Sequence, residues 1–160
     1  MVRLVRRSST AGLVVASTSA AVDRGTKTQM GAAAVVYVGD LVRMRTFYER
    51  CFGLLPGIDA DRGYCVLQSN AWLLTLVQSD EALPATSPPA RRSQTPIKLA
   101  MEVASISATR ALAVDLGGRV DPVVGEWRFG DETRCDAVDP EGNVVQLIER
   151  GTFGSGESGF

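Results

Sequence analysis

Histidine is absent from the 160 residues of this chain, and cysteine is scarce. Histidine is the commonest general base near neutral pH and the commonest protein ligand of zinc, iron, nickel and copper, so sites built on an imidazole are excluded. The three cysteines, Cys51, Cys65 and Cys135, form no CxxC pair, which argues against a disulfide framework and against a structural zinc site. We therefore expect a reducing compartment, the cytoplasm, with export through the N-terminal segment as the minor alternative.

The sequence also lacks an excess of charge and a long hydrophobic run. Its net charge is −1 and its pI is near 5.5, so no basic field attracts nucleic acid or an anionic membrane. No segment approaches the roughly 18 to 20 apolar residues that span a bilayer. The expected partner is a small organic ligand, with no nucleic acid and no membrane. Because 45% of the residues are apolar, the chain can bury one good core.

The two ends of the chain differ from its middle in composition. Residues 1–29 combine early arginines with many Ser, Thr and Ala residues, and we interpret them as a disordered leader in preference to a weak targeting segment. Met30 is then a candidate for the true start. Residues 152–160 are rich in glycine and serine and are expected to form a flexible tail. The single domain is expected to span residues 30–151.

One stretch, residues 36–53, organises the remainder. A short apolar strand runs into Asp40, a residue type that caps helices by accepting a free backbone N–H. A helix is predicted to follow and to end at Gly53, where the chain can turn left-handed. Its buried face is predicted from apolar residues at helical spacing, namely Leu41, Met44, Phe47, Tyr48 and Cys51.

The elements that follow are predicted to repeat one pattern. Strands are predicted at residues 56–59, 64–68, 71–77, 96–103, 119–124, 132–138 and 143–149. A proline-rich linker covers residues 80–95, and a second helix runs from the cap Ser105 to Gly117 and Gly118. A loop holding Glu126, Trp127 and Phe129 precedes the last two strands. The fold class predicted is α+β, with two tandem β-α-β-β-β modules at residues 31–79 and 96–150.

Positions in the two modules correspond at a constant offset of 65 residues. Asp40 matches Ser105 as a helix cap, and Gly53 matches Gly118 as a helix stop. Val38, Leu41 and Phe47 match Val103, Ile106 and Leu112 in the same register. An offset that holds through strand, cap, helix and stop supports the internal repeat.

Three motifs resemble the vicinal oxygen chelate superfamily, which includes glyoxalase I, extradiol dioxygenases, fosfomycin resistance enzymes and bleomycin resistance proteins. They are VYVGDLVRMRTFYERCFGL in the first module, and PIKLAMEV and DAVDPEGNVVQLIER in the second. The resemblance covers about residues 32–150. It implies two modules whose curved mixed sheets enclose a cavity, and it implies a homodimer.

The resemblance also implies where a metal ion would be held. The family's ligand positions correspond here to Ala33, Thr75, Lys98 and Gln146. Alanine donates nothing, a protonated lysine repels a cation, and Thr and Gln are weak neutral oxygen donors. We therefore expect no metal and no cofactor.

Strand alternation places further side chains on the same face as these four positions. The expected ligand-binding residues are Tyr37, Thr75, Lys98, Glu102, Trp127 and Gln146. Lys98, Glu102 and Gln146 are expected to form a polar cluster; the alternative is that Lys98 and Glu102 pair with each other or with solvent. For Trp127 the alternative to a pocket rim is a hydrophobic plug beside Phe129.

Three functions are compatible with these residues. The first is a metal-independent small-molecule-binding protein, of the bleomycin resistance type, that sequesters or senses its ligand. The second is a diverged lyase, isomerase or dioxygenase-like enzyme, for which Glu102 is a weak candidate base and Glu149 another. The third is an interaction domain whose cavity is filled by side chains. The cysteines are expected to be buried and inert, because no histidine is present to activate them.

Overall fold

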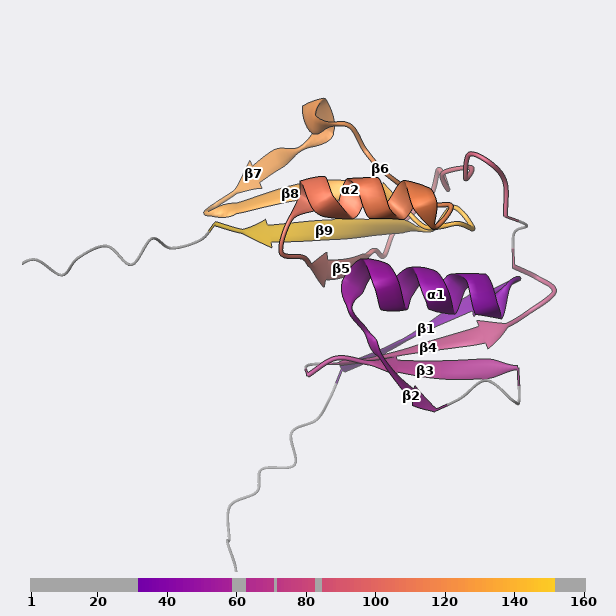
Figure 1. Ribbon diagram of the computed structural model, residues 1–160. Helices are drawn as coiled ribbons and strands as arrows, with labels where there is room; N and C mark the ends of the chain where they lie inside the picture. Colours follow the sequence, from indigo (N-terminus) through magenta and orange to yellow (C-terminus); the bar gives the residue numbers. More distant parts are fainter. Residues whose placement is uncertain (1–31, 59–62, 71, 83–84, 152–160) are drawn as a thin grey trace, which may run out of the picture. The chain divides into compact units, whose positions relative to one another are not determined.

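The organising stretch forms the predicted helix, α1, at Leu41–Phe52. The Asp40 side chain accepts a hydrogen bond from the Arg43 N–H at 3.0 Å, and Gly53 adopts φ 64°, so both ends form as the residue types predict. The predicted face is buried. The computed structural model describes residues 32–58, 63–70, 72–82 and 85–151 (Figure 1).

The first module forms a mixed sheet with the strand order β1-β4-β3-β2. Its strands are β1 (Ala32–Val38), β2 (Leu55–Ile58), β3 (Tyr64–Gln68) and β4 (Trp72–Gln78). β1 pairs with β4 in parallel, and β3 pairs with β2 and β4 in antiparallel fashion. Alternate residues such as Leu67, Leu74 and Leu76 are buried with α1, whereas the opposite face is open.

The second module repeats this arrangement with the strand order β5-β9-β8-β6. Its elements are β5 (Leu99–Glu102), α2 (Ile106–Asp115), β6 (Arg119–Val120), β8 (Glu132–Val138) and β9 (Val144–Arg150). β5 pairs with β9 in parallel and β8 pairs with β9 in antiparallel fashion, as β1, β4 and β3 do. Ser105 caps α2 through its hydroxyl, which accepts from the Ala108 N–H. The predicted fold class and the repeat are confirmed.

Three local predictions are wrong. Residues 127–129 form a strand, β7 (Trp127–Phe129), paired with β8 after a 3-10 turn, η1 (Val123–Gly125), and not a loop. The fifth strand begins at Leu99, so Lys98 precedes it. The left-handed glycine after α2 is Gly117, at φ 81°; Gly118 instead packs so closely on Phe47 that a Cβ would lie 2.5 Å from that ring.

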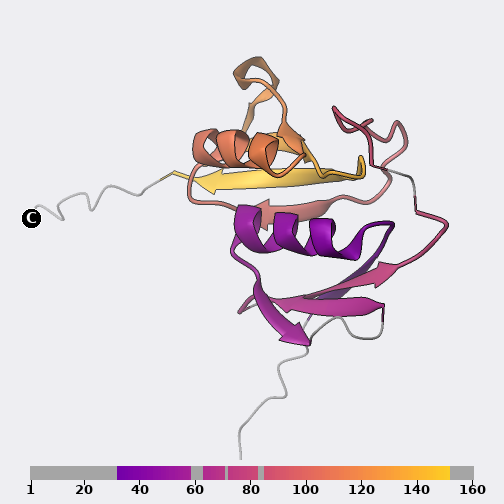
Figure 2. The ribbon, with the colours of Figure 1, turned by 45° about the vertical axis from the view of Figure 1, so that its right-hand side comes forward.

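The two helices lie side by side, each on one face of its own sheet (Figures 1 and 2). Hydrogen bonds join the modules: the Tyr48 hydroxyl of α1 donates to Asp139 Oδ2 at 3.0 Å, and the Glu141 carboxylate accepts from the N–H groups of Gly39 and Asp40. Asp139 and Glu141 belong to the turn between β8 and β9. The first-module motif and the DPEGN motif, two of the three that carry the family resemblance, therefore contact each other in the fold.

All described residues belong to one compact unit, Gly31–Phe160. The predictions for residues 1–29 and for the tail at 152–160 lie outside the described residues. Across the part of the chain that is described, neither helix has the length and apolar character needed to cross a membrane.

Candidate ligand-binding site

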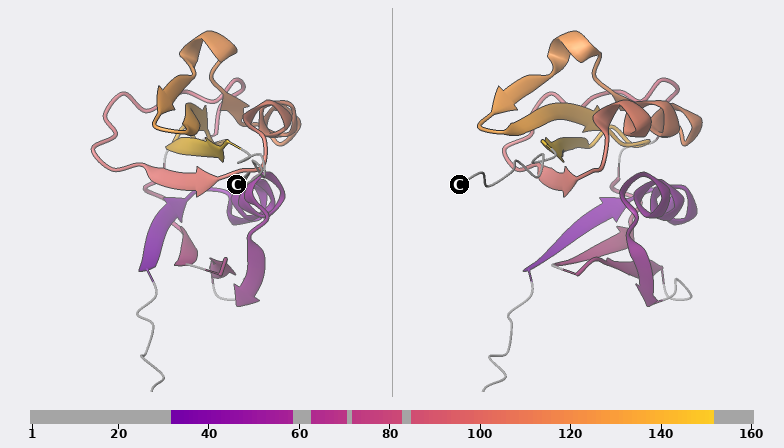
Figure 3. Two further views of the ribbon diagram at one scale, coloured as in Figure 1. Left: turned by 90° about the vertical axis from the view of Figure 1, so that its left-hand side faces the viewer. Right: turned by 60° about the vertical axis from the view of Figure 1, so that its left-hand side comes forward.

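A cavity of about 680 Å³ lies between the edge strands of the two sheets. β1 is the edge of the first sheet and β5 is the edge of the second, and β5 lies above β1 in both views of Figure 3. The segment that links the modules contributes part of the cavity wall. The cavity is lined by Val35, Val36, Tyr37, Tyr48, Ser79, Glu81, Ala82, Arg92, Gln94, Thr95, Pro96, Ile97, Leu99, Asn143, Val144 and Val145.

Most of the wall is apolar or aromatic. Tyr37 on β1 is 62% exposed, so its ring presents an accessible surface to a ligand, and Ile97 is exposed on the linker side. Tyr48 is fully buried beneath the cavity with its hydroxyl held by Asp139. Small-molecule sites have volumes of about 300–1,000 Å³, mostly apolar walls and a few fixed polar groups. The cavity meets the requirements of volume and of wall chemistry.

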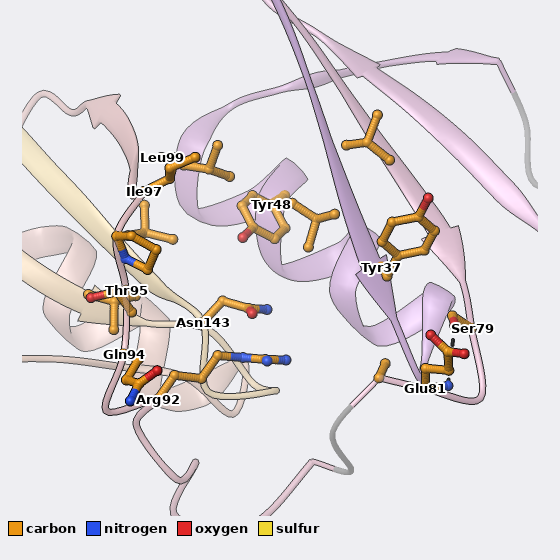
Figure 4. Close-up of a pocket in the computed structure, with 16 residues that line it drawn as sticks. Tyr37, Tyr48, Ser79, Glu81, Arg92, Gln94, Thr95, Ile97, Leu99 and Asn143 are labelled. Atoms are coloured by element: carbon orange, nitrogen blue, oxygen red, sulfur yellow. Dashed lines mark hydrogen bonds between the residues drawn. The ribbon is translucent and has the colours of Figure 1, made fainter.

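Arg92 supplies the positive charge of the cavity (Figure 4). Its Nε is buried and has no hydrogen-bond partner among the described residues. In Figure 4 the Arg92 guanidinium and the Asn143 amide both point toward the side on which Tyr37 lies. An unpaired buried donor costs free energy unless an acceptor reaches it, so this end of the cavity favours a ligand with acceptor oxygens.

The turn between β8 and β9 positions these two polar residues. The Arg92 N–H donates to the Gly142 carbonyl at 3.0 Å, which fixes the linker on the turn. Gly142 has φ 89°, and a Cβ there would lie 2.0 Å from the Ala90 carbonyl oxygen, so only glycine permits this close approach. The Asn143 side-chain amide donates to Asp139 Oδ2 at 2.8 Å. The turn therefore holds Asn143 by its side chain and Arg92 by its backbone.

Of the six predicted ligand-binding residues, the structure places Tyr37 in the cavity and the other five outside its lining. Thr75 lies on the open face of the first sheet, between Val35 and Val66 in register. Lys98 donates to Asp136 Oδ2 at 2.8 Å, and the Gln146 side-chain oxygen accepts from Arg134 at 3.1 Å. These three residues face away from the two helices, as strand alternation predicts.

The polar cluster expected from Lys98, Glu102 and Gln146 takes a different form. Glu102 pairs with Arg150 at 3.0 Å, and both side chains are exposed, so Glu102 neither joins Lys98 nor pairs with it. The centre of the charged network on the second sheet is instead Asp136, which bridges Lys98 and Arg91. Asp136 is 7% exposed, and its Oδ1 has no partner among the described residues.

Trp127 is neither a rim of this cavity nor a buried plug. It is 38% exposed on β7, opposite Arg134 in register, and the neighbouring Phe129 lies beneath the Arg134 guanidinium at 4.2 Å. The pair forms a partly exposed aromatic surface on the hairpin of β7 and β8. Its cation–π contact with Arg134 accounts for Phe129 without a ligand.

The sequence analysis missed Arg92, Asn143 and Asp136. Asn143 was accessible to prediction, because it follows a DPEG turn whose carboxylate can bind it. Arg92 lies in a proline-rich stretch without periodicity, so no pattern indicates the direction of its side chain. Asp136 is flanked by Cys135 and Ala137, both buried on the opposite face, and it lies opposite Gln146 in a register that the sequence does not specify.

The remaining candidate groups have structural partners. Glu149 accepts a hydrogen bond from the Ile106 N–H at 2.6 Å and thereby caps α2. All three cysteines are free and buried, and burial raises the pKa of Cys51 to about 11. Within the described ranges, no group of three or more Cys, Asp or Glu side chains lies close enough together to hold a metal ion.

Solved structures share this fold at low sequence identity. A glyoxalase/bleomycin resistance protein from Albidiferax ferrireducens T118 is 21% identical, with a TM-score of 0.57 over 76% of this chain and 99% of that chain. A glyoxalase/bleomycin resistance protein/dioxygenase family enzyme from Burkholderia phytofirmans PsJN is 14% identical, with a TM-score of 0.57 over 75% and 98%. The fosfomycin resistance protein FosX from Listeria monocytogenes is 14% identical, with a TM-score of 0.55 over 76% and 93%.

Comparisons by sequence add no relative. No family model matches the chain, and no curated protein matches it. The likeness to the solved structures therefore concerns the fold.

Proposed function

We propose that this chain, which has the fold of the vicinal oxygen chelate superfamily, is a metal-independent protein that sequesters or senses a small organic ligand. The observation that carries the proposal is the cavity of about 680 Å³ between β1, β5 and the linker. Its apolar wall and its few polar groups match the properties of small-molecule sites. The ligand is expected to lie against Tyr37 and to contact Arg92 and Asn143.

Metal independence is supported by the side chains at the four register positions. Ala33 offers no donor, and the Lys98 ammonium is engaged with Asp136. Gln146 already accepts from Arg134. A divalent ion prefers several carboxylate or imidazole ligands, which Ala33, Thr75, Lys98 and Gln146 do not supply.

Thermal unfolding with a panel of small organic compounds tests the proposal. A ligand that binds only the folded protein raises the Tm. At a hundredfold excess over Kd it raises the free energy of unfolding by roughly 2.7 kcal/mol. We expect a shift that is unchanged by EDTA and is reduced in Tyr37→Ala. Tyr37 is exposed, so this substitution spares the core. Shifts that require an added divalent metal, or a panel with no shift at all, would contradict the proposal.

The second candidate function is a diverged lyase, isomerase or dioxygenase-like enzyme, and Asp136 is the observation that favours it. Its Oδ2 is held by Arg91 and Lys98, and its Oδ1 is buried without a hydrogen-bond partner among the described residues, so Asp136 is a fixed carboxylate opposite Gln146 on the second sheet. Glu102 is paired in solvent and Glu149 caps α2, so neither has this environment. Chemical conversion of a bound ligand, lost in Asp136→Asn with the fold retained, would favour the enzyme; recovery of every ligand unchanged would exclude it.

We also propose that the protein is a homodimer. On the face of the first sheet opposite α1, Leu55 is 62% exposed and Leu73 is 42% exposed, and Gln68 pairs with both in register; neither leucine lines the cavity. Adjacent exposed apolar side chains on one sheet face are typical of an interaction surface. A second copy of the chain is the occupant that this proposal names.

A further inference from the structure

We propose that the cavity takes an organic monocarboxylic acid, with its carboxylate at Arg92 and its apolar body against Tyr37 and Ile97. This inference rests on the proposed function and specifies its ligand class. It starts from the contrast between two neighbouring arginines. Arg91 binds Asp121 and Asp136, whereas Arg92 makes no ion pair within the described part of the chain.

Two carboxylates lie in the turn that binds the Arg92 backbone, and both are committed to other donors. Asp139 accepts hydrogen bonds from the Tyr48 hydroxyl, from the Asn143 amide and from two backbone N–H groups. Glu141 accepts from the N–H groups of Gly39 and Asp40. Arg92 is half-buried and lines the cavity without an ion pair among the described residues. A guanidinium without an ion pair favours an anionic acceptor over a neutral one.

The shape of the guanidinium selects among acceptors. Arginine presents a planar fork of N–H donors that matches the two oxygens of a carboxylate. The Asn143 side chain lies beside this fork in Figure 4, and its amide nitrogen is fixed on Asp139. A carboxylate placed here would accept hydrogen bonds from the guanidinium end of Arg92 and balance its charge.

The far side of the cavity limits the ligand to one acid group. Tyr37 and Glu81 lie across the cavity from Arg92 in Figure 4. Glu81 is exposed, and its carboxylate would repel a second anionic group on the ligand. The cavity is also lined by Tyr37, Ile97 and Leu99, which suit an aromatic or aliphatic body.

Titration calorimetry with four aromatic acids and their primary amides tests the inference. The acids are benzoate, phenylacetate, 3-phenylpropanoate and indole-3-acetate, and each amide preserves the shape while removing the charge. We expect at least one acid to bind the intact chain roughly ten- to a hundredfold more tightly than its amide, the ratio expected for a charge-assisted hydrogen bond. No acid that exceeds its amide would overturn the inference.

Three variants separate the role of Arg92 from general charge effects. Arg92→Met is expected to abolish the preference for the acid and to leave the affinity for the amide within about twofold. Arg92→Lys keeps the charge without the planar fork of donors, so it is expected to retain part of the preference. Arg50→Met removes the same charge from an exposed position on α1 and is expected to change neither affinity. Circular dichroism checks the fold of each variant, and unchanged acid affinity in a folded Arg92→Met would overturn the inference.

The two proposals fail in different ways. Equal binding of acids and amides, lost in Tyr37→Ala, would refute the carboxylate and leave the small-molecule function intact. No binding of any acid or amide, together with no Tm shift across the wider panel, would refute both.

Discussion

A single buried carboxylate connects the two modules at the residue scale. Asp139 is fully buried, and its two oxygens accept four hydrogen bonds, one of them from Tyr48 of α1. Residues in the FY and DPEGN motifs thus satisfy one another, and neither motif could bury its polar groups alone. This contact explains physically why the two motifs occur together in one chain.

Removal of the Tyr48 hydroxyl tests this connection. Tyr48→Phe is expected to lower the free energy of unfolding by about 1.5–3 kcal/mol, because a buried carboxylate loses a donor. Urea denaturation measures the change. Tyr37→Phe is the matched control, since the Tyr37 side chain is exposed and its hydroxyl has no hydrogen-bond partner in the described residues. Equal stability changes in the two variants would refute the role of the buried hydrogen bond.

Asp139 also gives stability a pH dependence of known sign. Burial raises the pKa of Asp139 above the ordinary value of 3.8, although four hydrogen bonds oppose the shift. Above pH 3.8 the unfolded chain releases this proton before the folded chain does, so the Asp139 contribution to stability falls as the pH rises through the raised pKa. Urea denaturation from pH 4 upward is expected to show this fall in the wild type and to lose it in Asp139→Asn. The opposite slope in the difference between the two proteins would contradict the assignment.

The burial of a side chain was predictable where helical or strand periodicity determines it. The position of a side chain that depends on a distant partner was not. Met44, Phe47 and Tyr48 are in the core, as the helical spacing predicts. The pairing of Lys98 with Asp136 was not predicted, because it joins two segments that are distant in the sequence. Ion pairs across strands depend on register, which sequence spacing does not specify by itself.

At the scale of elements, each helix begins at a carboxylate from the second module. Glu141 accepts from the N–H groups of Gly39 and Asp40 before α1, and Glu149 accepts from the Ile106 N–H at the start of α2. Carboxylates are favourable at helix N-termini, because unsatisfied N–H groups and the helix dipole meet there. The helices of the two modules are therefore bound at their N-termini by different glutamates, α1 by Glu141 and α2 by Glu149.

Alanine substitutions at these two glutamates should differ in their cost. Glu141→Ala leaves two N–H groups without an acceptor and is expected to destabilise the fold by about 2–4 kcal/mol, while Glu149→Ala leaves one and is expected to cost about half as much. Chemical denaturation of both variants measures the ratio. Glu81→Ala, at an exposed site, serves as the control. A larger cost at Glu149 than at Glu141 would contradict this ranking.

The turn that positions Arg92 should be sensitive to a single methyl group. Gly142→Ala combines a left-handed φ of 89° with a Cβ 2.0 Å from the Ala90 carbonyl oxygen, so the linker must move off the turn. Gly130→Ala has a comparable φ of 64° but no atom within 4 Å. We expect about 1–2 kcal/mol of destabilisation at Gly130 from the backbone alone, and clearly more at Gly142. Similar Tm losses in the two variants would mean that the linker does not pack on the turn as described.

The elements that the sequence analysis identified correctly are those with strong local signals. α1, α2 and the long strands carry caps, periodicity or alternation, and each occurs near its predicted position. β7 was missed because it has only three residues, too few for the alternation of Trp127, Arg128 and Phe129 to distinguish a strand from a loop. The left-handed glycine after α2 is Gly117, one residue before the position that matches Gly53 in the repeat. Gly118, at the matching position, instead lies close to the Phe47 ring.

For the whole molecule, topology was predictable and the place of the cavity was not. Two β-α-β-β-β modules follow from the repeat, but the cavity depends on how the linker returns between β1 and β5. Prolines mark that linker as irregular without specifying its path. Consequently Tyr37, on an edge strand, is the predicted site residue that lines the cavity, while Thr75 and Gln146 lie on interior strands of the two sheets.

The open face of the first sheet provides the last prediction, which concerns the proposed homodimer. Leu73, the second residue of β4, is exposed on this face and does not line the cavity, so Leu73→Asp alters the surface without altering the ligand site. A charge buried between two copies without a partner is strongly unfavourable, and sedimentation is expected to show a dimer for the wild type and a monomer for this variant. Val42→Asp places the same charge on an exposed residue of α1 and is expected to leave the dimer intact. A monomeric wild type at micromolar concentration, or a dimeric Leu73→Asp, would rule out this face as the interface.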